Sequence, residues 1–322
     1  KDPKDVDSWL AVDLTESKPA PEPTGPRTVV AGNNPPRVVY ANDYPMPWGW
    51  RVSSYFLTKG VAAGLAIAAL FALLAGASVD NAWMAWQVPL IAGVMLALTG
   101  VLLVWDLKRP DRFLYLLTKG NPGSWLVRGA WILSAYGAVL GVWFLAGVAG
   151  QDAVVEIAIW LGAILGLGVA GYTAFLFGQA EARDLWQSPT LLWHMIAGAL
   201  LAGGGASLIA EAATEATGAV EAFTWSMLIG AAVIGLFAIG ELFMPHPTRN
   251  VEEAAHHMRK GAFAAEYWIG FALAAVIPIA LGALVLGGAS VWLGAAAGVA
   301  GTAGIWFMDD AFVKAGQSVP LS

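Results

Sequence analysis

The stretch Tyr55-Phe-Leu-Thr-Lys-Gly-Val-Ala-Ala-Gly-Leu-Ala-Ile-Ala-Ala-Leu-Phe-Ala-Leu-Leu-Ala-Gly76 is apolar almost throughout and carries one charged residue, Lys59. As a helix, about 20 such residues cross about 30 Å of hydrocarbon. Seven further apolar stretches of similar length follow, at 87–105, 130–149, 154–177, 190–210, 223–243, 267–287 and 291–308. The sequence therefore predicts an all-α polytopic membrane protein with eight transmembrane helices.

The overall composition leads to the same fold class. Hydrophobic residues make up 58% of the chain, charged residues make up 12%, and the mean hydropathy is +0.64, which excludes an ordinary soluble protein. Transmembrane β-strands would need stretches of about ten residues with alternating polarity, which the sequence lacks. The 38 glycines fit packed membrane helices, because small residues let helices approach closely.

The basic residues are confined to one side of the predicted membrane. Eight crossings place both termini beside the loops at 106–129, 179–189 and 244–266, and all seventeen Lys and Arg residues fall on that side. The charged residues of the opposite turns are all acidic, namely Asp80, Asp152, Glu211, Glu215 and Glu221. The positive-inside rule then predicts a multi-pass protein of the inner membrane whose termini and long loops are cytoplasmic.

This basic face is also a candidate docking surface, because it would attract an acidic partner subunit. The residues predicted to contribute are Lys108, Arg109, Arg112, Lys119 and Arg128.

The first fifty residues differ from the rest of the chain. Seven prolines lie between Pro3 and Pro36, charge is mixed, and residues 1–10 lack the apolar core of a secretory signal. This composition suits a segment that orders only on a partner. We therefore expect 1–50 to be an extended arm on a partner subunit and 51–322 to be the membrane domain.

Cysteine and histidine usage limits the redox chemistry. The chain has no cysteine and only four histidines, of which His194 alone falls within a predicted span. Iron–sulfur clusters held by thiolates are thus excluded from this chain, and a bis-histidine haem at membrane depth is not expected. Any redox centre would belong to a neighbouring subunit or to a diffusible quinone, and no metal site or nucleic-acid partner is predicted.

Several ionisable residues lie at or near membrane depth, where charge is costly and each is a functional candidate. They are Lys59, Asp106, Glu156, Glu181, His194, Glu241, Asp309 and Asp310. All of them except Glu181 also have an ordinary structural explanation. The aspartates stand at predicted helix ends, where Arg109, Arg112 or Lys314 could pair with them, and Lys59 could extend to the basic face. Similarly, Glu156 could cap a helix, while Glu241 and His194 could be interfacial.

Several ordered motifs resemble the NrfD-like family, the membrane subunits of polysulfide reductase and related complexes. The first three are Trp48-Gly-Trp-Arg-Val-Ser-Ser-Tyr-Phe-Leu-Thr-Lys-Gly-Val-Ala-Ala-Gly64, Asp106-Leu-Lys-Arg-Pro-Asp-Arg-Phe113 and Ser124-Trp-Leu-Val-Arg-Gly-Ala-Trp131. The others are Gly171-Tyr-Thr, Leu185-Trp-Gln-Ser-Pro189 and the ending Lys314-Ala-Gly-Gln-Ser-Val-Pro-Leu-Ser322. Together they span Trp48 to Ser322.

The resemblance implies two four-helix bundles in lipid and a quinone pocket near the face that carries the termini. It also implies that a [4Fe–4S] electron-transfer subunit docks on that face, with a molybdopterin or other catalytic subunit further out. The quinone would be menaquinone or ubiquinone, a choice that the residues leave open.

The resemblance also assigns candidate roles. Tyr172 looks like the tyrosine of the family pocket and is the first choice for a hydrogen-bond donor to the quinone, although a tyrosine bonded to backbone would look the same. Arg51, Tyr55 and Lys59 would form the other wall, where relatives often have a neutral donor. Asp106 and Glu181 would relay protons. Together with Tyr172 and Lys59, these two acids form the predicted catalytic set.

A longer proton path between the two faces would use Asp106, Glu156, His194, Glu241 and Asp309, but scattered acids do not establish pumping. Two other classes remain open. A secondary transporter would also have many spans and intramembrane charges, often with helices broken at Gly or Pro. A purely structural anchor for a soluble oxidoreductase would need no quinone site at all.

Overall fold

The structure is a computed structural model that describes residues 48–107, 109–110, 113–180, 183–215, 217–241, 243–244 and 246–319. Most of the predicted arm, residues 1–47, lies outside the described residues, as do Lys108, Arg112 and Glu181.

The described residues form helices and no strands, and eight helical spans are long and apolar enough to cross a membrane. The prediction of an all-α protein with eight spans is therefore confirmed. The spans are α2 (Trp50–Leu74), η1 (Trp83–Gln87) with α3 (Val88–Asp106), α5 (Trp125–Val148), α6 (Asp152–Gly178), α7 (Leu191–Thr214), α8 (Val220–Gly240), α10 (Ala264–Phe271) with η4 (Ala272–Val276) and α11 (Ile277–Leu286), and α12 (Val291–Ala315). The loops contain α4 (Phe113–Thr118), the 3-10 turn η3 (Asp184–Gln187) and α9 (Arg249–Arg259).

Two spans contain a π-helical turn directly before a proline. Pro89 follows η1 and Pro278 follows η4, each at the start of the next α-helical segment. A proline inside a helix lacks an N–H and its ring clashes with the carbonyl four residues back, so a widened turn accommodates it. Both spans continue as helix past the proline, so neither is broken into two half-helices.

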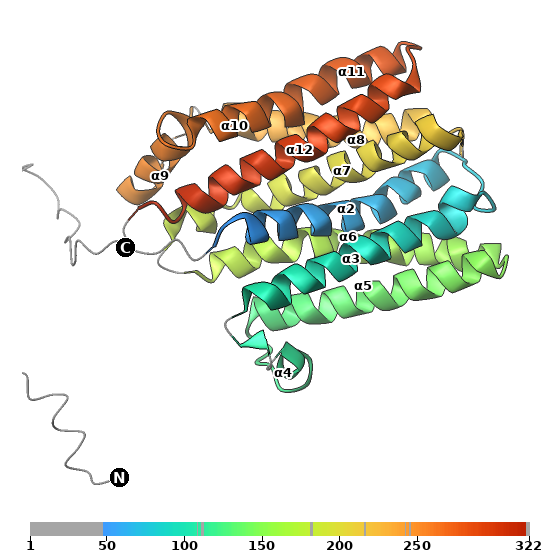
Figure 1. Cartoon of the computed structure of the whole chain (residues 1–322), viewed down its shortest axis with the longest axis horizontal. Coiled ribbons are helices and arrows are strands. Elements are labelled where there is room, and N and C mark those ends of the chain that lie inside the picture. Colours follow the sequence, from blue (N-terminus) through green and yellow to red (C-terminus); the bar gives the residue numbers. More distant parts are fainter. Residues whose placement is uncertain are drawn as a thin grey trace, which may run out of the picture. The chain divides into compact units, whose positions relative to one another are not determined.

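The spans pack as two groups of four. Helices α2, α3, α5 and α6 contact one another, α7, α8, α11 and α12 form the second group, and α2 packs along α7 to join the groups (Figure 1). Gly64 of α2 faces Ala199 and Gly203 of α7 so closely that a β-carbon at position 64 would strike the Ala199 carbonyl. Small residues thus bring the central helices together, as expected in lipid.

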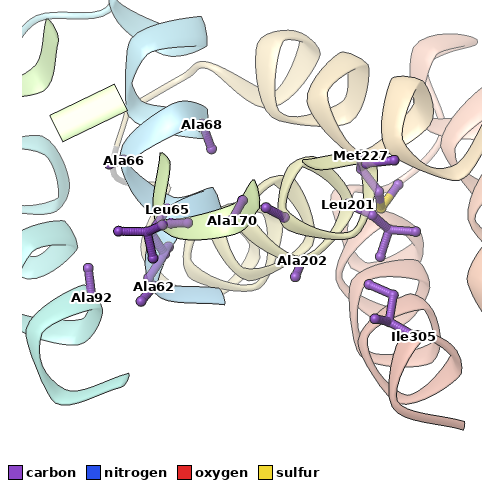
Figure 2. Close-up of a cluster of buried hydrophobic side chains, with 14 of the residues drawn as sticks. Ala62, Leu65, Ala66, Ala68, Ala92, Ala170, Leu201, Ala202, Met227 and Ile305 are labelled. Carbon is purple, nitrogen blue, oxygen red and sulfur yellow. The ribbon is translucent and has the colours of Figure 1, made fainter. Parts of the chain in front are cut away.

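The core around this contact is built largely from alanine. Figure 2 shows Ala62 and Leu65 of α2 near Ala170 of α6, with Leu201 of α7 and Ile305 of α12 further along the cluster. The outer faces of the spans instead expose large aliphatic side chains, which suits contact with lipid. They include Val101, Leu145, Ile157, Ile164, Leu236 and Val299.

One helix boundary differs from the prediction in a way that matters for function. The apolar stretch predicted to end at residue 308 continues as helix to Ala315. Asp309 and Asp310 therefore lie inside α12, and both are buried, instead of standing at a solvated helix end. The hydropathy of the segment falls at these two acids, which is why sequence alone placed the end too early.

Candidate functional site

A buried polar cluster joins the two helices that carry the predicted quinone residues. Tyr55 and Lys59 project from α2, and Tyr172 and Thr173 project from α6. The hydroxyls of Tyr55 and Tyr172 are hydrogen-bonded to each other, and the Tyr55 hydroxyl lies 3.3 Å from Oγ1 of Thr173. We call these four residues the tyrosine–lysine cluster. Three of the four predicted quinone-pocket residues, Tyr55, Lys59 and Tyr172, therefore lie in one cluster.

Lys59 is fully inside the protein. It is 2% exposed, and its Nζ donates to Oγ1 of Thr173 at 2.5 Å and to the carbonyl oxygen of Ala170 at 2.9 Å. The rings of Tyr172 and Tyr55 lie 5.1 and 5.6 Å from Nζ, within cation–π range. These partners offset part of the cost of burying an ammonium group. Lys59 therefore does not extend to the basic face. The ordinary structural explanation that the sequence offered for this residue is thus wrong.

The local sequence explains why the cluster forms. Tyr55 and Lys59 are four residues apart and so share one face of α2. Gly129 in the Ser124–Trp131 motif leaves room for the Tyr172 ring, because a β-carbon there would overlap it.

Aromatic side chains cover the cluster on the loop side. Trp48 stacks on Trp186 with centroids 4.7 Å apart, and Phe177 lies 5.1 Å from Trp48 and 5.2 Å from Phe56. These residues pack in one hydrophobic group with Tyr55 and Tyr172. We call Trp48, Phe56, Phe177 and Trp186 the aromatic cover.

Arg51 and Asp106 lie apart from the cluster. The Arg51 guanidinium packs over the ring of Trp105 at 4.8 Å and interacts electrostatically with Asp106 at the end of α3. Arg51 precedes Lys59 by two turns of α2, which is about 12 Å along the axis. The fourth predicted pocket residue, Arg51, therefore links the start of α2 to the end of α3.

His194 and Asp309 form a second polar group beside the cluster. Nε2 of His194, near the start of α7, lies 3.3 Å from Oδ1 of Asp309 on α12. A small cavity of about 20 Å³ is lined by Lys59, Asp309 and His194, together with Ala170 and Met195. That volume admits a single water, for which at least three polar groups are present. Asp309 thus connects Lys59 with His194 across one water-sized gap.

The neighbouring Asp310 points elsewhere. It accepts a hydrogen bond from Ser53 at 2.8 Å and pairs with Lys314 at 2.6 Å, and Lys314 also binds Glu266 at 3.0 Å. Asp310 therefore fastens α12 to α2, a structural role that the sequence did not separate from that of Asp309.

A much larger cavity, of about 540 Å³, lies at the loop end of the second helix group. It is bounded by α7, α8, α10 and α12 and is covered by α9; we call it the α9 cavity. Its walls are mostly apolar, and its ionisable lining residues are Asp184, His194, Glu241, His246 and Tyr267. The sequence flagged His194 and Glu241 singly but gave no sign that they share a cavity.

Glu241 is one of two acidic residues that line this cavity, the other being Asp184. Burial raises the pKa of its carboxyl group, and the nearby Arg259, His246 and His194 oppose that rise. Arg259 donates to the Glu241 backbone oxygen at 2.8 Å and lies 2.9 Å from Nε2 of His246. The carboxyl group therefore keeps its proton to a higher pH than an exposed glutamate does.

The remaining predicted residues lie elsewhere. Glu156 is exposed near the start of α6, about 24 Å along that helix from Tyr172. Among the residues predicted for docking, Lys119 packs on Tyr115 and Arg128 on Trp125, and Arg128 Nε donates to the Pro122 oxygen at 2.7 Å. No group of three or more His, Asp or Glu side chains that could hold a metal occurs among the described residues.

Eight long apolar helices that enclose buried ionisable groups define a polytopic α-helical membrane protein. The family described as "Polysulphide reductase, NrfD" matches residues 38–318, so the chain belongs to the NrfD family, the membrane subunits of respiratory oxidoreductases. It is similar to the polysulfide reductase C subunit of Wolinella succinogenes, with 25% identity over 265 residues, which cover 73% of this chain and 82% of that protein. The resemblance inferred from the motifs is confirmed.

Proposed function

We propose that this chain is the quinone-reactive membrane subunit of its oxidoreductase complex, exchanging electrons between menaquinone or ubiquinone and a [4Fe–4S] partner subunit. The observation that carries the proposal is the tyrosine–lysine cluster, in which two hydroxyls and an ammonium converge inside an apolar protein. Quinone chemistry needs donors for the ring oxygens and a proton source in an apolar slot. The cluster supplies these groups.

The chain's own residues would act by hydrogen bonding and proton exchange. Tyr172 would donate to one ring oxygen, exchanging its bond with Tyr55 for one to the substrate. Lys59, through Thr173, would keep the hydroxyl pair supplied with a proton. Because the tyrosines are buried under the aromatic cover, entry of a ring requires Trp48, Phe177 and Trp186 to part.

Protons would leave the cluster through Asp309. Lys59 and Asp309 share the water-sized cavity, and Asp309 lies next to His194, which also lines the α9 cavity. This route uses two of the predicted proton-path residues, and Glu241 stands at its outer end. Asp106, Glu156 and Glu181 are not needed for it.

The partner subunits would rest on the basic face. Arg109, Lys119 and Arg128 lie around α4 at the loop end of the first helix group, the same end as the aromatic cover. An acidic iron–sulfur subunit there, with a molybdopterin or other catalytic subunit beyond it, would bring its cluster toward the quinone. We propose that this face is cytoplasmic and that the membrane is the inner one. Because the protein has no cysteine, Lys119→Cys and Asp80→Cys give clean labels for opposite sides.

The direct test is quinone turnover by the natively purified complex with Tyr172→Phe, measured together with iron–sulfur content. Tyr136→Phe is the matched control, because Tyr136 is equally buried and its hydroxyl donates to the Ala62 oxygen at 2.5 Å, away from the cluster. We expect Tyr172→Phe to lower turnover about tenfold or more while the clusters remain. Equal quinone turnover in the two variants would favour the alternative in which the chain is only a structural anchor. Activity of the chain without any iron–sulfur partner would favour the secondary transporter.

A further inference from the structure

The α9 cavity contains polar groups that the protein itself does not satisfy. Tyr267 is 3% exposed and lines the cavity, yet its hydroxyl makes no hydrogen bond to any residue in the described part of the chain. The Glu241 carboxyl oxygens likewise accept no hydrogen bond from the described residues, although Arg259 binds the backbone oxygen of the same residue. Both residues line the cavity, so a ligand bound there could take up the hydrogen bonds that the protein does not make.

The apolar part of the lining restricts what that ligand can be. Phe237, Val251, Met258, Met308 and Phe312 form much of the wall. A volume of about 540 Å³ falls within the usual range for small-molecule sites and far exceeds the 20 Å³ beside Lys59. A lipid-soluble molecule with few polar atoms fits such a lining better than a charged metabolite does.

The polar groups define the head of the ligand. Tyr267 is a hydrogen-bond donor, Glu241 can accept a hydrogen bond or, when its carboxyl group holds a proton, donate one, and the two residues lie close enough to interact electrostatically. His194 adds a third polar group, with one ring nitrogen facing Asp309. Donors that converge within an apolar slot suit a planar ring that carries carbonyl or hydroxyl oxygens.

We propose that the α9 cavity is a second binding site for a quinone-class ligand, with Tyr267 and Glu241 bonded to its ring oxygens and the apolar wall around its ring and tail. This site belongs to the second helix group, whereas the tyrosine–lysine cluster lies between α2 and α6 in the first. His194 and Asp309 stand between the two, so a ligand in the cavity would also sit at the outlet of the proton route.

A photoreactive short-chain naphthoquinone tests the site in the purified complex, with labelled peptides identified by mass spectrometry. We expect labelling of the cavity-lining segments of α7, α8 and α10, apart from any labelling of α2 and α6. Tyr267→Phe should weaken the cavity labelling about tenfold, because one hydrogen bond to the ring is lost. Tyr172→Phe should leave it unchanged.

A pair of neighbouring substitutions on α8 provides the steric control. Ala238 lines the cavity, so Ala238→Trp should fill it and abolish the labelling, whereas Ile239 is 49% exposed on the outer face and Ile239→Trp should have no effect. If the α8 variants fail to assemble, Tyr267→Phe still tests whether the naphthoquinone binds in the α9 cavity.

Two results would overturn the proposal. The first is that the cavity is not labelled, or that Tyr267→Phe leaves its labelling unchanged. The other is labelling displaced by added phospholipid but not by excess unlabelled naphthoquinone, which would make the cavity a lipid site. Loss of quinone turnover in Tyr172→Phe with cavity labelling intact would support both sites. Unchanged turnover in Tyr172→Phe would contradict only the quinone site at the tyrosine–lysine cluster.

Discussion

The tyrosine–lysine cluster and the α9 cavity contain similar groups in opposite states. In the cluster, Lys59, Thr173 and the two tyrosine hydroxyls bond to one another and leave only water-sized space. In the cavity, Tyr267 and Glu241 face an open volume without partners among the described residues. Under the two proposals, the fold itself satisfies the polar groups of the cluster, whereas a bound ligand satisfies those of the cavity.

Lys59→Met, which changes the tyrosine–lysine cluster, should produce the largest effect on quinone turnover. Methionine has a similar length but no charge, so the cluster loses its proton source, and we expect quinone turnover to fall about 100-fold. Removing a buried ammonium should also leave the thermal stability equal or higher, because its desolvation cost disappears. The measurement pairs turnover with thermal unfolding of the complex, and substitution of the exposed Lys260, Lys260→Met, is the control. Unchanged turnover would separate Lys59 from the chemistry.

The adjacent aspartates of α12 should respond differently. Asp309→Asn interrupts the route between Lys59 and His194, and we expect about tenfold slower turnover with little loss of stability. Asp310→Asn instead weakens the pairing with Lys314 and Ser53, and should lower the free energy of unfolding by about 2 kcal/mol with turnover nearly intact. Both quantities can be measured on the same purified variants. If the two variants behave alike, Asp309 is structural as well.

The smallest expected effect is a pH dependence of the α9 cavity. Burial raises the pKa of Glu241 against the opposing influence of Arg259, His246 and His194. The contribution of the neutral carboxyl to stability is therefore complete below the ordinary glutamate pKa and is lost as the pH rises through the raised value. Naphthoquinone labelling of the cavity should weaken over the same window, about threefold, as the donor ionises. Glu241→Gln should make the labelling independent of pH there, and a persisting slope would assign the titration to a histidine.

Parts of the candidate site followed from the sequence because they depend on local spacing. Tyr55 and Lys59 share a helix face at a separation of four residues, and the Gly171-Tyr-Thr motif pointed to Tyr172. The family resemblance grouped Arg51 with them, but Arg51 lies two helical turns before Lys59 and packs beside Trp105. The aromatic cover could not be foreseen, since it joins Trp48, Phe177 and Trp186 from three separate segments.

The sequence by itself determined the eight spans and, because it has no cysteine, excluded thiolate-held clusters from this chain. Those properties depend on local apolar length and on composition, because lipid imposes its requirement on each segment separately. Only the tertiary structure decided that His194 meets Asp309, 115 residues away, that Asp310 faces Ser53 instead, and that Glu241 and Tyr267 share a cavity. Helices that are apolar on every side give no signal for which face turns inward, so these pairings depend on how the helices pack.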